Sequence, residues 1–171
     1  MAPDSLQQLI TGALCGPFFL LNGVHMIEKY NLFLEKLKKL SDLPGLIFRL
    51  ILAYGFYGPA TQKISNIDGI SEWFASMNYP FPTLNAYLAA GTETLGFILL
   101  FLGLATRIIT VPLMFVMIVA IGTVHLGNGF EAGNNGFEIP LYYLLMLFSI
   151  FISGPGKISL DAFIQRKYFN N

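Results

Sequence analysis

The chain alternates long apolar runs with short polar clusters. The apolar runs cover residues 46–63, 84–104, 108–126 and 137–152. A helix needs about 20 apolar residues to cross the hydrocarbon core of a bilayer, and a somewhat shorter run crosses it with the help of flanking residues. The pattern therefore predicts four membrane-spanning helices. The predicted fold class is an all-α integral membrane four-helix bundle with an N-terminal amphipathic, interfacial helical segment.

The N-terminal part of the chain has a different pattern. Residues 28–40 alternate leucine and aromatic positions with lysine and glutamate, which predicts a short basic amphipathic helix at the membrane surface. Residues 6–27 are apolar but contain a proline and several glycines, so we expect an interfacial segment and leave an additional span open. Because no basic residue precedes them, we expect no cleaved signal peptide. The expected domains are an interfacial segment at 1–45, a four-span membrane domain at 46–156 and a cytoplasmic tail at 157–171.

The charged residues indicate an orientation. Only 12% of the residues are charged and the net charge is zero, which argues against a nucleic-acid partner. Basic residues gather before the first span, at the turn after the second span and in the tail, whereas the other two loops contain only Lys63. By the positive-inside rule, both ends of the four-span domain should lie in the cytoplasm. We expect Arg49 to extend to the interface and Trp73, in the 64–82 loop, to anchor an interfacial helix there.

An acidic residue, Glu93, lies near the middle of the second span. Insertion scales put an acid at that depth at roughly 3 kcal/mol unfavourable, so Glu93 should face other helices, a cavity or a partner. Ala86, Ala89, Ala90 and Gly96 share its face and would allow a second helix to approach closely. Depth along the helices predicts Tyr54, Tyr57, Gln62 or Lys63 as its partner. Glu93 would either exchange protons, for instance beside a quinone-like headgroup, or lock the helices together.

A second polar cluster is expected at the outer ends of the spans. Lys63 ends the first span, His125 ends the third, and Asn134, Asn135 and Glu138 begin the fourth. His125 and Glu138 could form a carboxylate–imidazole pair that orients a proton-accepting or metal-binding histidine, or they could simply cap the helices. Met114, Met117 and His125 fall near one stripe and would suit copper(I), although methionine is also a common core residue.

Two long segments of the chain resemble a known family. The first consists of FRLILAYGFYGPATQKI and WFASMNYPFPTLNAYLAAGTETLGFILLFLGLATRIITVPLMFVMIVAIGTVH, and the second is NNGFEIPLYYLLMLFSIFISGPGKISLDAF. Together they resemble the DoxX family of small four-span membrane proteins, and more closely its HvfX-like branch. The family pattern maps onto Arg49, Lys63, Trp73, Pro80, Glu93, Gly103, Arg107, His125, Asn135, Glu138 and Asp161.

The resemblance implies a prokaryotic inner-membrane protein. One member of the family is a subunit of a thiosulfate:quinone oxidoreductase, and HvfX-like members accompany the maturation of copper-binding peptides. Three hypotheses follow: a subunit of a redox or copper-peptide-maturation assembly, a quinone-reactive oxidoreductase subunit, or a non-catalytic scaffold or small-molecule channel. The expected partners are the lipid bilayer and another membrane or membrane-associated subunit. The sequence leaves open whether the protein is an enzyme and whether it forms a homo-oligomer.

Overall fold

The computed structural model describes residues 28–38 and 40–168, and within these ranges the chain contains helices and no strand. The chain divides after Ser41 into two units, which are described separately. In the first unit residues 28–38 form a helix, as the amphipathic pattern predicts. The expectation for residues 6–27 lies outside the described residues.

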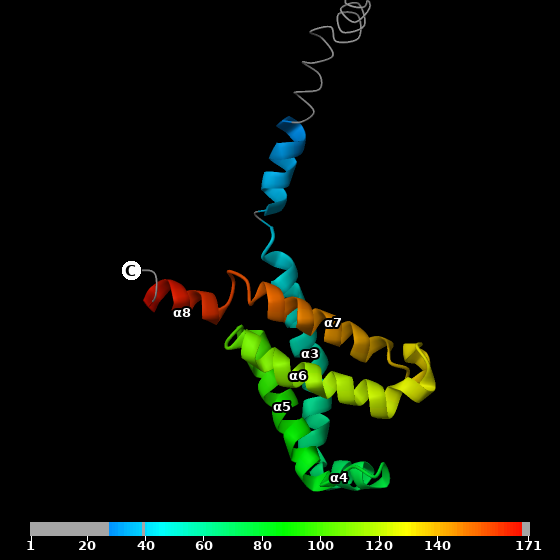
Figure 1. The fold of residues 1–171 in the computed structure, drawn as a ribbon. Coiled ribbons are helices and arrows are strands. Elements are labelled where there is room, and N and C mark those ends of the chain that lie inside the picture. The colour runs from blue at the N-terminus through cyan, green and yellow to red at the C-terminus, as the bar shows by residue number, and fades with distance from the viewer. Residues whose placement is uncertain (1–27, 39, 169–171) are drawn as a thin grey trace, which may run out of the picture. The chain divides into compact units, whose positions relative to one another are not determined.

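The second unit contains four long helices, shown in Figure 1. They are α3 (Leu43–Ser65), α5 (Pro82–Leu102), α6 (Thr106–Ala120) and α7 (Glu138–Ser153). A short helix, α4 (Ile67–Ser76), lies between α3 and α5, where the sequence predicts an interfacial helix. After α6 come a π-helical turn, η1 (Ile121–His125), and two 3₁₀ turns, η2 (Leu126–Asn128) and η3 (Ala132–Asn134). The last helix is α8 (Leu160–Tyr168).

The four long helices pack as two antiparallel pairs. α3 packs mainly on α5 and α6 mainly on α7, while contacts between α5 and α6 and between α3 and α7 close the ring. Each helix sends fully buried side chains into one core, which includes Leu52, Phe56, Leu100, Leu113, Leu147 and Ile150. The predicted helical bundle is confirmed.

The length and exposure of the helices fit a membrane. Three helical stretches, which end at Ser65, Leu102 and Asn128, are long and apolar enough to cross one. α7 is apolar but has 16 residues, or about 24 Å of helix, which is shorter than a typical hydrocarbon core of about 30 Å. The outer faces of the helices expose many large apolar side chains, as lipid contact requires.

Two glycines allow the helices to approach closely. A Cβ atom on Gly96 of α5 would lie 2.7 Å from a methyl carbon of Leu113 on α6, and one on Gly55 of α3 would overlap the ring of Tyr143 on α7. The Gly96 contact belongs to the small-residue face predicted around Glu93. On α5 that face is buried, with Ala86, Ala90, Glu93 and Gly96 facing the other helices.

Arg49, Arg107 and Lys157 lie at one end of the bundle, which we call the basic end. This end is more compact than the sequence suggests. Arg49 was expected to extend to the interface, but it is 1% exposed and donates a 2.7 Å hydrogen bond to the carbonyl of Ile158. The prediction failed because the segment after α7 folds back over the first turns of α3. Asp161 completes this closure, since its carboxylate accepts hydrogen bonds from the backbone N–H groups of Ala105 and Thr106 at 2.8 and 3.0 Å. The segment predicted as a simple tail therefore packs on the bundle.

Candidate functional site

An ion pair joins α3 to α5 at the level of Glu93. The Lys63 Nζ atom lies 2.7 Å from one carboxylate oxygen of Glu93 and 3.0 Å from the other. Glu93 is 3% exposed, and the side chain of Lys63 is 17% exposed. Lys63 was one of the predicted partners, and that prediction is confirmed.

The two tyrosines predicted beside Glu93 lie elsewhere. Tyr54 is 83% exposed and Tyr57 is 54% exposed, and Tyr57 packs its ring edge-on against Phe97. The buried stripe of α3 contains Arg49, Ala53, Phe56 and Ala60, with Lys63 at its end. Tyr54 and Tyr57 are at the right depth but on a different side of the helix, because successive helical residues turn by about 100°. Within the described residues they do not hydrogen-bond to Glu93, so this prediction was wrong.

Lys63 and Glu93 line a cavity of about 540 Å³, which we call the aromatic pocket. α3, α4, α5 and α6 contribute to its wall, together with η1, η3 and the first turns of α7. Six aromatic side chains line it: Phe56, Trp73, Phe74, Tyr79, Phe115 and Tyr143. Its volume falls in the range of about 300–1,000 Å³ typical of small-molecule sites, which are apolar cavities with a few placed polar groups.

The predicted pair between His125 and Glu138 does not form. The Nδ1 atom of His125 lies 2.8 Å from the carbonyl oxygen of Asn135, and Glu138 accepts hydrogen bonds from the Ala132 backbone and the Tyr142 hydroxyl. The prediction was wrong because the loop between α6 and α7 folds onto itself and supplies nearer backbone partners. His125 and Asn135 line the aromatic pocket, whereas Glu138 serves to hold the loop.

A π-helical turn, η1, carries His125 to this pocket. Such turns are rare and occur often at functional sites, because the extra residue per turn rotates the side chains that follow. The hydroxyl groups of Tyr79 and Thr123 form a hydrogen bond that ties the segment after α4 to this turn. The apolar pattern predicts a continuous helix to Leu126, and the π turn within it has no reliable sequence signal.

The remaining candidates lie in different places. Trp73 lines the aromatic pocket, while Arg49 and Arg107 lie at the basic end of the bundle. Met117 also lines the aromatic pocket, but Met114 packs against the buried core. Among the residues that the structure describes, no three His, Cys, Asp or Glu side chains gather as a metal site.

Comparison with known proteins identifies the family. The family model described as DoxX matches residues 45–126. A Bacillus subtilis (strain 168) protein named "Putative oxidoreductase CatD" is 34% identical over 130 residues, a region that covers 75% of this chain and 92% of that protein. The chain belongs to the DoxX family. The matched residues include Lys63, Glu93 and His125, which line the aromatic pocket.

Two further relatives of this DoxX-family protein come from other bacteria. "Inner membrane protein YphA" of Escherichia coli (strain K12) is 31% identical over 128 residues, which cover 68% of this chain and 86% of that protein. An "Uncharacterized protein" of Haemophilus influenzae is 31% identical over 136 residues, which cover 75% of this chain and 87% of that protein. No solved structure matches the chain significantly.

Proposed function

We propose that this DoxX-family protein is the membrane subunit of an oxidoreductase and binds a lipophilic quinone-type substrate in the aromatic pocket. The observation that carries this proposal is the position of the Lys63–Glu93 ion pair in the wall of a cavity lined mostly by apolar and aromatic side chains. Aromatic walls suit a flat ring, and the ion pair supplies the polar contact that its carbonyl group needs. The name of the Bacillus subtilis relative also points to redox chemistry.

The ion pair gives the two residues distinct roles. The Lys63 ammonium group has three N–H donors, so it can keep its bond to Glu93 and donate another to a ring carbonyl. Reduction of a quinone to a hydroquinone takes up equal numbers of electrons and protons. In the ion pair the transferable proton is on the Lys63 ammonium group, so Lys63 would give a proton to the ring oxygen and regain one from water, while the Glu93 carboxylate holds the ammonium group in place. The electrons would come from a partner subunit, as the redox-assembly hypothesis requires.

Trp73 provides a direct test of binding. It is the only tryptophan in the chain and it lines the aromatic pocket, so a quinone bound there should quench its fluorescence. We expect saturable quenching of the purified protein by a short-chain ubiquinone analogue. Glu93→Gln should weaken binding, and Lys167→Gln, outside the pocket, should leave it unchanged. Quenching that rises linearly without saturation, or that is the same in Glu93→Gln, would overturn the proposal.

We propose the HvfX-like branch of the family for this chain, and with it a copper-peptide-maturation assembly as the second candidate function. Of the three residues that would suit copper, Met117 and His125 line the aromatic pocket while Met114 packs against the core, so the three do not share one cavity. Identification of a co-purifying quinone by mass spectrometry would favour the redox assembly. A scaffold role would instead be supported if a Glu93→Ala, His125→Ala double variant assembled normally with its membrane partner.

We also propose that the basic end of the bundle faces the cytoplasm, because the positive-inside rule places Arg107 and Lys157 there. A variant with Cys15 replaced by serine allows single cysteines to be introduced at chosen positions. In right-side-out vesicles an impermeant maleimide should label Glu131→Cys and should not label Lys157→Cys. Labelling in the reverse pattern would show the opposite orientation.

A further inference from the structure

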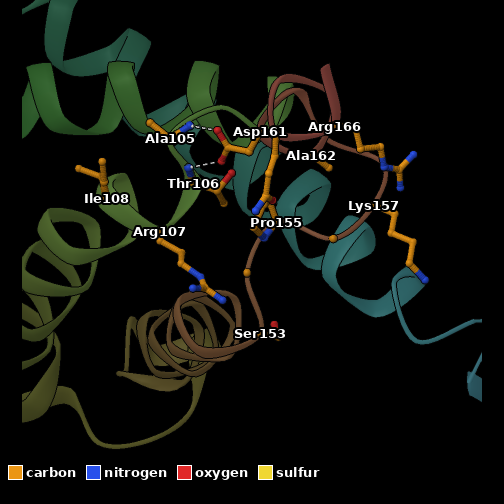
Figure 2. A pocket seen from close by; sticks show the side chains of 13 residues that line it. Ala105, Thr106, Arg107, Ile108, Ser153, Pro155, Lys157, Asp161, Ala162 and Arg166 are labelled. Carbon is orange, nitrogen blue, oxygen red and sulfur yellow. Dashed lines mark hydrogen bonds between the residues drawn. The ribbon is translucent and has the colours of Figure 1, made fainter. Parts of the chain in front are cut away.

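A second cavity lies at the basic end of the bundle, away from the Lys63–Glu93 pair. It has a volume of about 670 Å³ and is lined by the start of α6, the last residue of α7 with the segment 154–157 that follows it, and one side of α8. We call it the basic pocket. Each of these three segments contributes one cation, Arg107, Lys157 or Arg166. Figure 2 shows Arg107 on one side of the basic pocket and Lys157 and Arg166 on the other.

The two carboxylates in and beside the basic pocket, Asp161 and Asp42, already have partners within the protein. Both carboxylate oxygens of Asp161 accept backbone N–H groups of Ala105 and Thr106. Asp42, beside the pocket, forms an ion pair with Lys157 at 2.9 Å. The two arginines therefore lack a carboxylate partner within 4.0 Å in the part of the chain that the structure describes.

The arginines keep most of their hydrogen-bonding capacity. Arg107 donates one bond, through Nη2 to the carbonyl oxygen of Ile152 at 3.2 Å. The side chain of Arg166 makes no hydrogen bond to another described residue, although its charge acts on Asp42 from a distance. A guanidinium group has five N–H donors in a planar fork that matches phosphate oxygens. Two such groups on opposite sides of one cavity are suited to a ligand with two separated phosphates.

An apolar surface runs away from the basic pocket along α6. Ile108, which lines the pocket, is 75% exposed, and the exposed side chains of Val111, Phe115 and Ile118 continue the same stripe. A free phosphate or pyrophosphate would make no use of this stripe. The acyl chains of a lipid would cover it while the headgroup occupied the cavity.

We propose that the basic pocket binds an anionic phospholipid with two phosphate groups, such as diphosphatidylglycerol. One phosphate is held by Arg107 and the other by Arg166 with Lys157, and the acyl chains lie along the exposed stripe of α6. Basic pockets between membrane helices bind such headgroups by the same chemistry. The cavity is much larger than a single phosphate group, which also favours the two-phosphate ligand.

Native mass spectrometry of the delipidated full-length protein tests this proposal. We expect diphosphatidylglycerol to bind more tightly than phosphatidylglycerol, and phosphatidylcholine to bind weakest. Arg107→Gln and Arg166→Gln should each weaken binding of diphosphatidylglycerol about fivefold, since a basic side chain near a lipid surface contributes about 1 kcal/mol. Lys167→Gln is the matched control, because it removes the same charge one residue from Arg166 but does not line the pocket.

Other outcomes would overturn the proposal. Equal losses in Lys167→Gln and Arg166→Gln would indicate general attraction to negative lipids, and equal binding of phosphatidylglycerol would reject the two-phosphate site. Competition by pyrophosphate at the same concentration as the lipid would assign the site to a free anion. Arg166 is exposed on α8, so its variant should stay folded even if the loss of the Arg107 bond to Ile152 weakens the bundle.

Discussion

Lys63 reaches Glu93 across the contact between α3 and α5, with its Nζ atom 2.7 Å from the nearer carboxylate oxygen. The two residues are 30 positions apart in the sequence, and both line the aromatic pocket. A buried ion pair adds little net stability, because desolvating the two charges costs about as much as their attraction returns, but loss of one charge leaves the other buried without compensation. This balance leads to the first prediction.

Removal of one member of the pair should be more harmful than removal of both. Lys63→Met or Glu93→Leu alone should lower the free energy of unfolding by about 3–5 kcal/mol, because each leaves a buried charge without its partner. The double variant should come within about 1 kcal/mol of the native protein or exceed it. Unfolding in mixed detergent micelles measures all four proteins of this cycle. Additive losses in the double variant would show that the two side chains do not interact.

Gly55 and Gly58 offer a matched pair on α3. A methyl group at Gly55 would overlap the ring of Tyr143, whereas nothing lies within 4 Å of the equivalent position at Gly58. We therefore expect Gly55→Ala to lower the free energy of unfolding by about 1–3 kcal/mol, the usual cost of overpacking. Gly58→Ala should be neutral or stabilising by up to about 1 kcal/mol, because alanine favours helix. Thermal unfolding in detergent compares the two, and equal effects would contradict the observed contact between α3 and α7.

Asp161 should hold α8 and the start of α6 together. Its carboxylate accepts the N–H groups of Ala105 and Thr106, so Asp161→Ala leaves both donors without this partner. The expected loss is about 1–2 kcal/mol, with faster proteolysis between α7 and α8. Glu72→Ala, which removes an exposed acid on α4, is the control and should change neither measurement. Unchanged proteolysis in Asp161→Ala would show that other contacts hold α8.

The ion pair between Asp42 and Lys157 should weaken in acid. The hydrogen bond from Lys157 holds the pKa of Asp42 below its ordinary value of 3.8. A carboxyl group with a lowered folded pKa contributes stability that is complete above its unfolded pKa and is lost as the pH falls through the lower folded value. Hydrogen exchange of residues 154–160 should therefore accelerate below about pH 3.8.

Two variants separate this effect from the titration of other acids. An NMR titration of Lys157→Gln should show the pKa of Asp42 moving back up toward its ordinary value, because the main cause of the shift is gone. Asp42→Asn should lose the part of the acid response that belongs to this pair. The same pKa for Asp42 in the native protein and in Lys157→Gln would contradict the assignment.

The positions of the helices could be read from hydrophobicity to within a few residues. The second span was predicted at 84–104 and α5 is Pro82–Leu102, while the first was predicted at 46–63 and α3 is Leu43–Ser65. Such agreement arises because the thickness of a bilayer sets the length of an apolar run. The ends moved by two or three residues where proline starts a helix and Gly103, with φ of 69°, ends one.

The partners of the polar side chains were harder to predict. Depth along the helix placed Tyr54 and Tyr57 near Glu93, but the rotation of α3 turns them outward and brings Lys63 inward. His125 and Glu138 are close in the predicted hairpin, yet loop backbone groups satisfy both of them first. Spacing in the sequence gives the height of a residue in the bundle, while its partner depends on how neighbouring helices are rotated.

By itself, the sequence determined the apolar spans, the central acid, the small-residue face around it and the asymmetry of basic residues, because these depend on composition and period. Only the tertiary structure decided that Lys63 is the partner of Glu93, that both line an aromatic pocket, and that Arg49 is buried under the segment before α8. These features require several helices and a returning C-terminal segment to meet in one register. Packing of whole surfaces sets that register, and no local stretch of the chain encodes it.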